Sequence, residues 1–122
     1  MRDKIGDGLK ARNSNWTFKG SVVKNFDNHI SRSIPFYIKG QELTAQISDF
    51  FIKEDSICYE MGCSTGKLTN MLVKRHRLKK QAKFIGIDIE RDMIRQANKK
   101  KISSNVKFVC GDVLKYKLKK SD

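Results

Sequence analysis

The feature of this sequence that most constrains its fold is a regular alternation of strand-like and helix-like segments. Short apolar runs at residues 56–61, 83–87 and 106–110 are each followed by glycine, aspartate or both. Between these runs, apolar residues recur every three to four positions, which is typical of helices that bury one face. Strands joined by helices through right-handed crossovers form a parallel, doubly wound sheet. The sequence therefore predicts an α/β fold with three parallel strands in its second half.

The segment before the first strand predicts helices only. Residues 1–15 are polar and show no periodicity. A helix is expected from Gly20 and should end near Pro35, because the residue before a proline avoids the helical region. A second helix follows, whose apolar stripe consists of Leu43, Ile47, Phe50 and Phe51. We therefore divide the chain into an N-terminal helical segment, residues 1–52, and an α/β unit, residues 53–122.

Groups suited to binding a nucleoside stand at the ends of all three expected strands. The first strand leads into the loop Glu60-x-Gly62-x-Ser64-x-Gly66, where glycine permits a tight turn and a close approach of ligand to backbone. Asp88 ends the second strand and can accept hydrogen bonds from both ribose hydroxyls. Asp112 ends the third strand and can accept one from an adenine amine. Because open α/β sheets bind ligands at the carboxyl ends of their strands, the three ends together predict one nucleoside site.

Two other kinds of site share part of this pattern. Residues 62–66 match the G-x-S-x-G turn of serine hydrolases, but the only histidine that follows is His76, at the far end of the next expected helix. An acid about 20 residues after a glycine loop also binds the ribose of nicotinamide dinucleotides. That fingerprint requires G-x-G-x-x-G and does not call for Asp112. Both alternatives therefore explain fewer of these residues than the nucleoside site does.

These motifs resemble those of a known family. Glu60-x-Gly62-x-Ser64-x-Gly66, Gly86-Ile87-Asp88 and Gly111-Asp112 are similar to the successive motifs of class I S-adenosylmethionine-dependent methyltransferases. The resemblance implies a Rossmann-like fold, of which this chain holds the cofactor-binding first half. It also implies S-adenosylmethionine or S-adenosylhomocysteine as the cofactor, no metal, and transfer of a methyl group to an acceptor that the motifs do not name.

A longer stretch, from about Trp16 to Val113, resembles the carboxy-S-adenosylmethionine synthase family, which makes a carboxylated cofactor used in tRNA modification. The similarity rests on residues 15–18, residues 30–37 and the Cys63-Ser64 pair. It implies that Gly62, Cys63 and Ser64 contact the amino-acid part of the cofactor, Asp88 and Ile89 the ribose, Asp112 and Val113 the adenine, and Tyr37 the methionine end. The sequence departs from that family at Glu60, Phe36 and Ile89, where Asp, Gly and Asn are usual, and it ends before an Asn and an Arg that the family uses.

Positive charge is concentrated in the second half of the chain. The formal net charge is +13, and residues 74–122 hold 16 Lys or Arg against 5 Asp or Glu. A basic region of this kind can attract nucleic acid or an anionic surface, and the alternative is a solvated, lysine-rich surface. If RNA binds, we expect the contact at residues 74–83 and 99–101. The alternative to an enzyme is therefore a non-catalytic module that binds nucleic acid or a protein partner through this half.

The remaining expectations concern compartment and assembly. No apolar run approaches the roughly 18 residues of a membrane helix, and three cysteines without a metal-binding pattern fit a reducing compartment, so we expect a cytoplasmic protein. A complete doubly wound sheet has about six strands, with its first strand in the centre. Here the strand at residues 57–61 becomes an edge with unpaired backbone groups. We expect either that a second half is missing or that a second copy pairs with this edge in a homodimer.

Overall fold

A computed structural model, which describes residues 18–121, contains the expected helices and strands. Two helices, α1 (Ser21–Ser33) and α2 (Tyr37–Ile47), and a short 3-10 helix, η1 (Ser48–Phe50), precede the sheet. The rest alternates as β1 (Ile57–Met61), α3 (Lys67–Arg75), β2 (Lys83–Asp88), α4 (Arg91–Lys99) and β3 (Val106–Cys110). Asn15, Trp16 and Thr17, which contribute to the longer resemblance, lie outside the described residues. None of the described helices combines the length and the apolar character that a membrane span requires.

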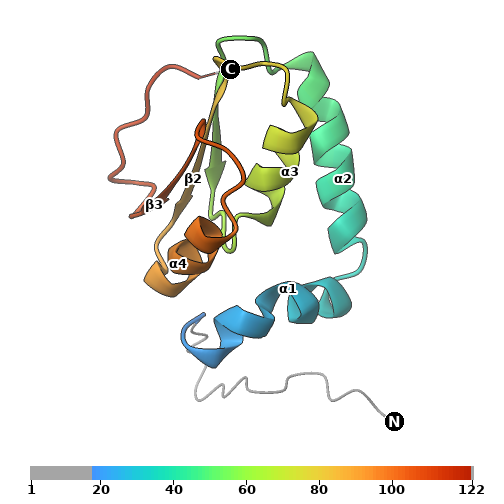
Figure 1. Cartoon of the computed structure of the whole chain (residues 1–122). Coiled ribbons are helices and arrows are strands. Elements are labelled where there is room, and N and C mark those ends of the chain that lie inside the picture. The colour runs from blue at the N-terminus through green and yellow to red at the C-terminus, as the bar shows by residue number, and fades with distance from the viewer. Residues whose placement is uncertain (1–17, 122) are drawn as a thin grey trace.

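The three strands form one parallel sheet in the order β1-β2-β3, which confirms the predicted architecture. The register places Glu60 beside Gly86 and Asp88 beside Cys110. All three strands therefore end at the same edge of the sheet, which is the lower edge in Figure 1. Within residues 18–121, no strand pairs with the outer side of β1.

Helices α3 and α4 cover one face of the sheet (Figure 1). Strand residues on this face are nearly inaccessible to solvent, Phe84 and Val106 at 1% each. On the opposite face, the chain after β3 returns across the sheet: the rings of Tyr59 and Tyr116 lie 6.4 Å apart, and the backbone N–H of Lys119 donates to the Tyr59 hydroxyl over 3.1 Å. The two faces of the sheet are therefore covered in different ways, one by helices and the other by an extended segment.

Helix α2 packs against α3 through a different face from the predicted one. Ala45 is its buried residue, and it shares one apolar core with Ile52 and the sheet. The predicted apolar stripe is instead solvent-exposed, with Leu43 at 55% and Phe50 at 85%. A small side chain lets two helices approach closely, so the alanine face packs inward and the stripe does not.

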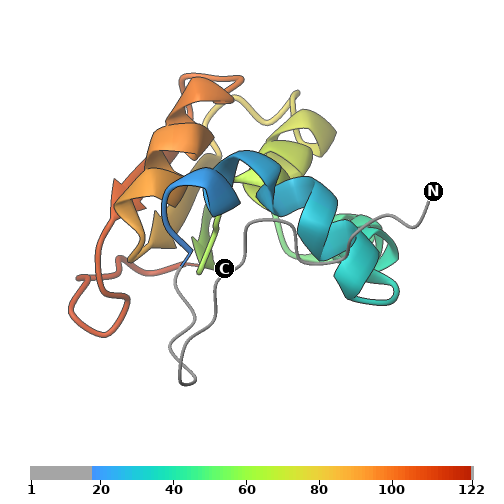
Figure 2. The same ribbon diagram turned by 90° about the horizontal axis from the view of Figure 1, so that it is seen from below.

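Helix α1 lies across the carboxyl ends of the strands, between α3 and α4 as seen from below (Figure 2). Val23 and Phe26 of α1 form a second small core with Met93 of α4. The backbone N–H of Gly20 also donates to the Asp92 carboxylate over 3.2 Å. Helix α1 is thereby held against the carboxyl ends of the strands, where the sequence predicts a ligand.

Candidate functional site

The loop after β1 is fastened to the end of β2 by its backbone. The N–H groups of Gly62 and Cys63 both donate to the carbonyl oxygen of Ile87, over 2.8 and 3.0 Å. Gly62, Ser64 and Gly66 have positive φ angles of 74°, 49° and 75°. Glycine adopts this region without a steric penalty, whereas other residues do so rarely. The alternation of small residues in the motif is therefore what allows the loop to turn into α3.

The motif glycines fall into two groups that serve different purposes. A Cβ on Gly66 would lie 2.5 Å from Cζ of Phe108, and one on Gly86 would lie 2.7 Å from Cδ1 of the same ring. These two glycines make room for the core. Gly62 and Gly111 have no atom within 4 Å of the place where a Cβ would be. The backbone of these two glycines therefore borders open space that a ligand can enter.

Asp88 organises the centre of the site. Its side chain is buried, and its two carboxylate oxygens accept hydrogen bonds from the backbone N–H groups of Ser64 and Glu90, both over 2.8 Å. It thus joins the β1–α3 loop to the start of α4. A carboxylate has about four acceptor positions, so two of them stay available after these two bonds are made. Ile89, the next residue, is 68% exposed.

The end of β3 lies beside the end of β2. The N–H of Gly111 donates to the carbonyl oxygen of Asp88 over 2.9 Å. Asp112 follows, and its Oδ1 accepts from the N–H of Leu114 over 2.9 Å, which closes a local turn. The Asp112 side chain is about one-third exposed, at 35%, and Val113 is half-buried. The second carboxylate oxygen of Asp112 lies 4.0 Å from Nζ of Lys115.

Glu60 lies on the helical side of the sheet, where it accepts a hydrogen bond from the hydroxyl of Thr69. Burial raises the pKa of Glu60 to about 7, and the nearby charge of Asp88 adds to the effect. Burial, and then the charges of Asp27 and Glu60, raise the pKa of the Tyr37 hydroxyl. Tyr37, predicted from the family resemblance, therefore lies within electrostatic range of Asp27 and Glu60.

The side chain of Cys63 belongs to the core and not to the open site. It is 3% exposed, and burial raises the pKa of its thiol to about 12. A thiol in this state is protonated and unreactive near neutral pH. The side chain of Cys63 is therefore not available to a ligand.

Helix α1 contributes residues that the sequence analysis did not select. Asp27 accepts hydrogen bonds from the hydroxyl of Thr65 over 2.6 Å and from Nζ of Lys100 over 2.8 Å. Burial alone would raise the pKa of Asp27, but these two hydrogen bonds hold it below its usual value. Thr65 and Asp27 are 38 residues apart, so no local pattern reveals their contact.

A small cavity of about 50 Å³ lies beneath α1, with Ser64 and Asp88 in its lining. Ligand pockets usually measure about 300–1,000 Å³. The open space beside Gly62 and Gly111, and not this cavity, is therefore where a larger molecule can approach the backbone. Among residues 18–121, no group of three or more His, Cys, Asp and Glu side chains is arranged to hold a metal ion.

The hydrolase interpretation does not fit this geometry. His76 caps the C-terminus of α3, and its Nε2 lies 2.7 Å from the hydroxyl of Ser48. Ser64 lies before the start of the same helix, whose nine residues alone span about 14 Å at 1.5 Å per residue. The histidine therefore cannot act as the base for Ser64.

Comparison with known proteins agrees with this geometry. Residues 59–122 match the sequence model of a family described as methyltransferase domain. This chain belongs to the methyltransferase-domain family. It is 37% identical to the carboxy-S-adenosyl-L-methionine synthase of Wolinella succinogenes over 129 residues, which cover 100% of this chain and 51% of that protein. It is 35% identical to the synthase of the same name from Staphylococcus epidermidis over 103 residues, 84% of this chain and 44% of that one. The chain spans about half the length of the curated relatives it matches.

Solved structures share the fold. The plantazolicin methyltransferase BpumL, crystallised with a substrate analogue and SAH, is 25% identical with a TM-score of 0.55, over 78% of this chain and 36% of that one. A protein from Methanococcus maripaludis that is assigned as an S-adenosyl-L-methionine-dependent methyltransferase gives a TM-score of 0.62 at 21% identity, over 85% of this chain and 47% of that one. The second likeness concerns the fold alone. These structures confirm the Rossmann-like methyltransferase architecture.

Proposed function

We propose that this chain binds S-adenosylmethionine at the carboxyl ends of β1, β2 and β3 and acts as the cofactor-binding part of a methyltransferase. The observation that carries the proposal is the open space beside Gly62 and Gly111, with the carboxylate of Asp88 between them. Strands lie about 4.8 Å apart, so the ends of β1 and β3 are separated by about 10 Å. An adenosine spans a distance of this order.

The residues present fit such a ligand. Gly62 and the loop backbone would receive the amino-acid part, since no side chain blocks them. The free acceptor positions of Asp88 would take the ribose hydroxyls, and the less engaged oxygen of Asp112 would take the adenine amine. Ile89 would lie beside the ribose and Val113 beside the base. The Cys63 side chain and the side of Gly66 where a Cβ would be both face the core, so these two residues stabilise the conformation of the loop.

Bound S-adenosylmethionine would supply an electrophilic methyl group on sulfur. The protein's contribution to such a transfer is mainly orientation, because holding two reactants in line removes much of the entropic barrier. Glu60 stands near the end of β1, where the methionine part would lie, and Tyr37 would reach this part from the start of α2. The methyl acceptor is not assigned by any described residue.

Isothermal titration of the full chain with S-adenosylmethionine and S-adenosylhomocysteine tests the proposal. We expect binding by the wild type, loss of binding on Gly111→Ala, and unchanged binding on Gly40→Ala, a matched glycine substitution in α2 that also meets open space. Folded protein that gives no heat with either ligand at millimolar concentration would contradict the proposal. Equal affinity of the Gly111→Ala and Gly40→Ala variants would contradict the placement of the adenine.

A carboxylated cofactor is the second candidate, because the chain is similar to proteins that are named carboxy-S-adenosyl-L-methionine synthases. In that case the protein should retain carboxy-S-adenosylmethionine during purification, and Tyr37→Phe should weaken its binding. Mass spectrometry of the ligand released on denaturation distinguishes the two candidates. Recovery of unmodified S-adenosylmethionine alone would exclude the second.

An RNA partner, a homodimer and a cytoplasmic location stay predictions.

A further inference from the structure

A groove of about 290 Å³ lies at the opposite end of the sheet from the cofactor site. It is formed between the α3–β2 and α4–β3 loops, and its polar lining consists of Lys74, Arg77, Lys80, Ser103, Ser104 and Asn105. These loops precede the amino ends of β2 and β3. Six residues of strand rise by about 20 Å, so the groove and the carboxyl ends of the strands are about that far apart.

The cations of this groove lack the carboxylate partners that other cations of the protein have. Lys74, Arg77 and Lys80 form no ion pair within residues 18–121. Elsewhere in that range, Lys39, Arg75, Arg95, Lys100 and Lys115 each lie within 4.0 Å of a carboxylate oxygen. Three unpaired cations within seven residues repel one another, which costs stability. A ligand that carries closely spaced negative charges would remove this cost.

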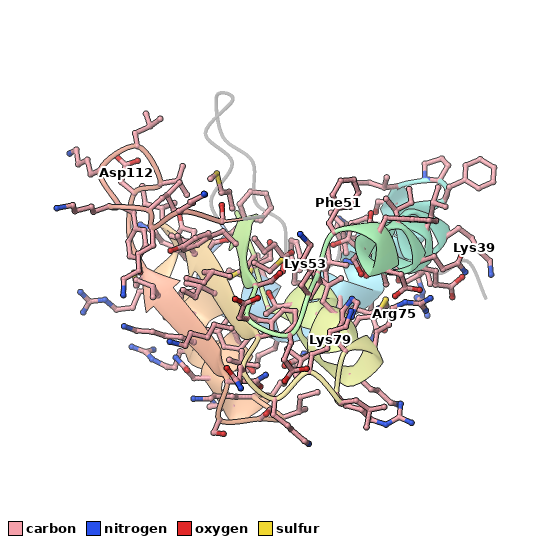
Figure 3. The ribbon with its side chains drawn as sticks, turned by 90° about the horizontal axis from the view of Figure 1, so that it is seen from above. Lys39, Phe51, Lys53, Arg75, Lys79 and Asp112 are labelled. Atoms are coloured by element: carbon pink, nitrogen blue, oxygen red, sulfur yellow. The ribbon has the colours of Figure 1, made fainter. Side chains whose placement is uncertain are left out.

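Several cations of the basic region that the sequence predicts make contacts within the protein, so fewer of them are available to a ligand. Arg75 donates to Asp49, and Nζ of Lys79 donates to the backbone carbonyl oxygen of Ile52. Both side chains therefore tie α3 and its loop to the segment after α2, near Lys53 in Figure 3. Lys100 reaches Asp27 of α1. These three cations take part in contacts within the protein, whereas Lys74, Arg77 and Lys80 line the groove together.

Hydrogen-bond acceptors accompany the cations. Nδ2 of Asn105 donates to the carbonyl oxygen of Ala82 over 2.9 Å, while its Oδ1 is buried and has no partner among the described residues. Buried acceptors are nearly always satisfied in folded proteins. The hydroxyls of Ser103 and Ser104 lie in the same groove. The two serine hydroxyls, rather than the buried Oδ1 of Asn105, are the acceptors that a ligand in the groove can reach, so a matching ligand would offer negative oxygens and hydrogen-bond donors.

We propose that this groove binds the sugar–phosphate backbone of RNA. Phosphates match the three cations, and the 2′-hydroxyl, which DNA lacks, matches the acceptors. An anionic membrane is flat and would reach a concave groove poorly, and an acidic peptide carries its charges on flexible side chains. The inference does not depend on the proposed cofactor, because the two sites lie at opposite ends of the sheet.

Fluorescence anisotropy with a labelled single-stranded RNA of 20 nucleotides tests the proposal on the full chain. The groove variant combines Lys74→Glu, Arg77→Glu and Lys80→Glu. The control variant combines Lys24→Glu, Lys53→Glu and Lys117→Glu, which changes the net charge equally at exposed residues outside the groove. We expect the groove variant alone to lose about tenfold in affinity, and its salt slope to fall by about 2, since each single-strand phosphate contact contributes about 0.7.

The same assay contains the outcomes that would overturn the proposal. Equal losses in the two variants would mean that only net charge matters. Equally tight binding of DNA with the same sequence would remove the role of the 2′-hydroxyl, and equally effective competition by poly-glutamate would indicate an acidic protein partner. No binding by the wild type at 50 mM salt would also refute it. If far-UV circular dichroism shows that the glutamate variants unfold, glutamine substitutions at the same two sets of positions replace them.

Discussion

Gly62 and Gly66 have nearly the same backbone conformation, with φ of 74° and 75°, but different surroundings. An alanine at either position must adopt the left-handed region, which costs about 1–2 kcal/mol. At Gly62 the added methyl group meets open space. At Gly66 it would lie 2.5 Å from Cζ and 2.6 Å from Cε1 of Phe108, a ring that is only 7% exposed.

The Phe108 ring cannot move aside easily, because it is held between the sheet and α4. Overpacking a core by a methyl group costs about 1–3 kcal/mol. Gly66→Ala should therefore lower the free energy of unfolding by about 2–5 kcal/mol, and Gly62→Ala by about 1–2 kcal/mol. Leucine lacks the ring atoms that collide, so Gly66→Ala should cost about 1–3 kcal/mol less in a Phe108→Leu background than in the wild type.

Urea unfolding followed by circular dichroism measures these differences, and calorimetric titration with S-adenosylhomocysteine measures the ligand affinity of each folded variant. We expect opposite rankings: Gly66→Ala is the less stable protein, and Gly62→Ala is the weaker binder. Equal destabilisation by the two substitutions, or no rescue by Phe108→Leu, would refute the assignment of Gly66 to the core. Unchanged affinity in Gly62→Ala would refute the assignment of Gly62 to the ligand.

Three further predictions concern charge and assembly. The pKa of Glu60 in the folded protein is raised to about 7. The free energy of unfolding should therefore fall as the pH rises from about 4.5 to 7, by about 3 kcal/mol at most, because each pKa unit corresponds to about 1.36 kcal/mol. Urea unfolding at pH 5 and 8 should show this loss in the wild type and not in Glu60→Gln. Asp88→Ala leaves the backbone N–H groups of Ser64 and Glu90 without their acceptor, at about 1–3 kcal/mol each, and should be much less stable in thermal melts than Asp88→Asn, which keeps one acceptor. The free edge of β1 should pair with a second copy, and light scattering that shows a stable monomer at all concentrations would contradict this.

Some residues of the candidate site can be recognised from their neighbours in the sequence, and others act through contacts with distant residues. Gly62, Asp88 and Asp112 can be located from the sequence, because each belongs to a short segment in which an apolar strand ends and a turn begins. Parallel pairing then brings such ends together whatever the detailed packing is. The same local reasoning predicted α1 and the effect of Pro35.

Other features depend on contacts between residues that are distant in the sequence, and only the tertiary structure decides them. No periodicity indicates that Asp27 bonds to Thr65, that the methyl position of Gly66 is occupied by the ring of Phe108, or that α2 packs through Ala45 and leaves its apolar stripe in solvent. Hydrophobic pattern specifies which side chains gain from burial, but shape and volume determine which of them the core accommodates. The order of the strands and the position of their ends were therefore determined by the sequence alone. The division of the glycines between ligand and core, and of the lysines between structural contacts and the open groove, was decided by packing in three dimensions.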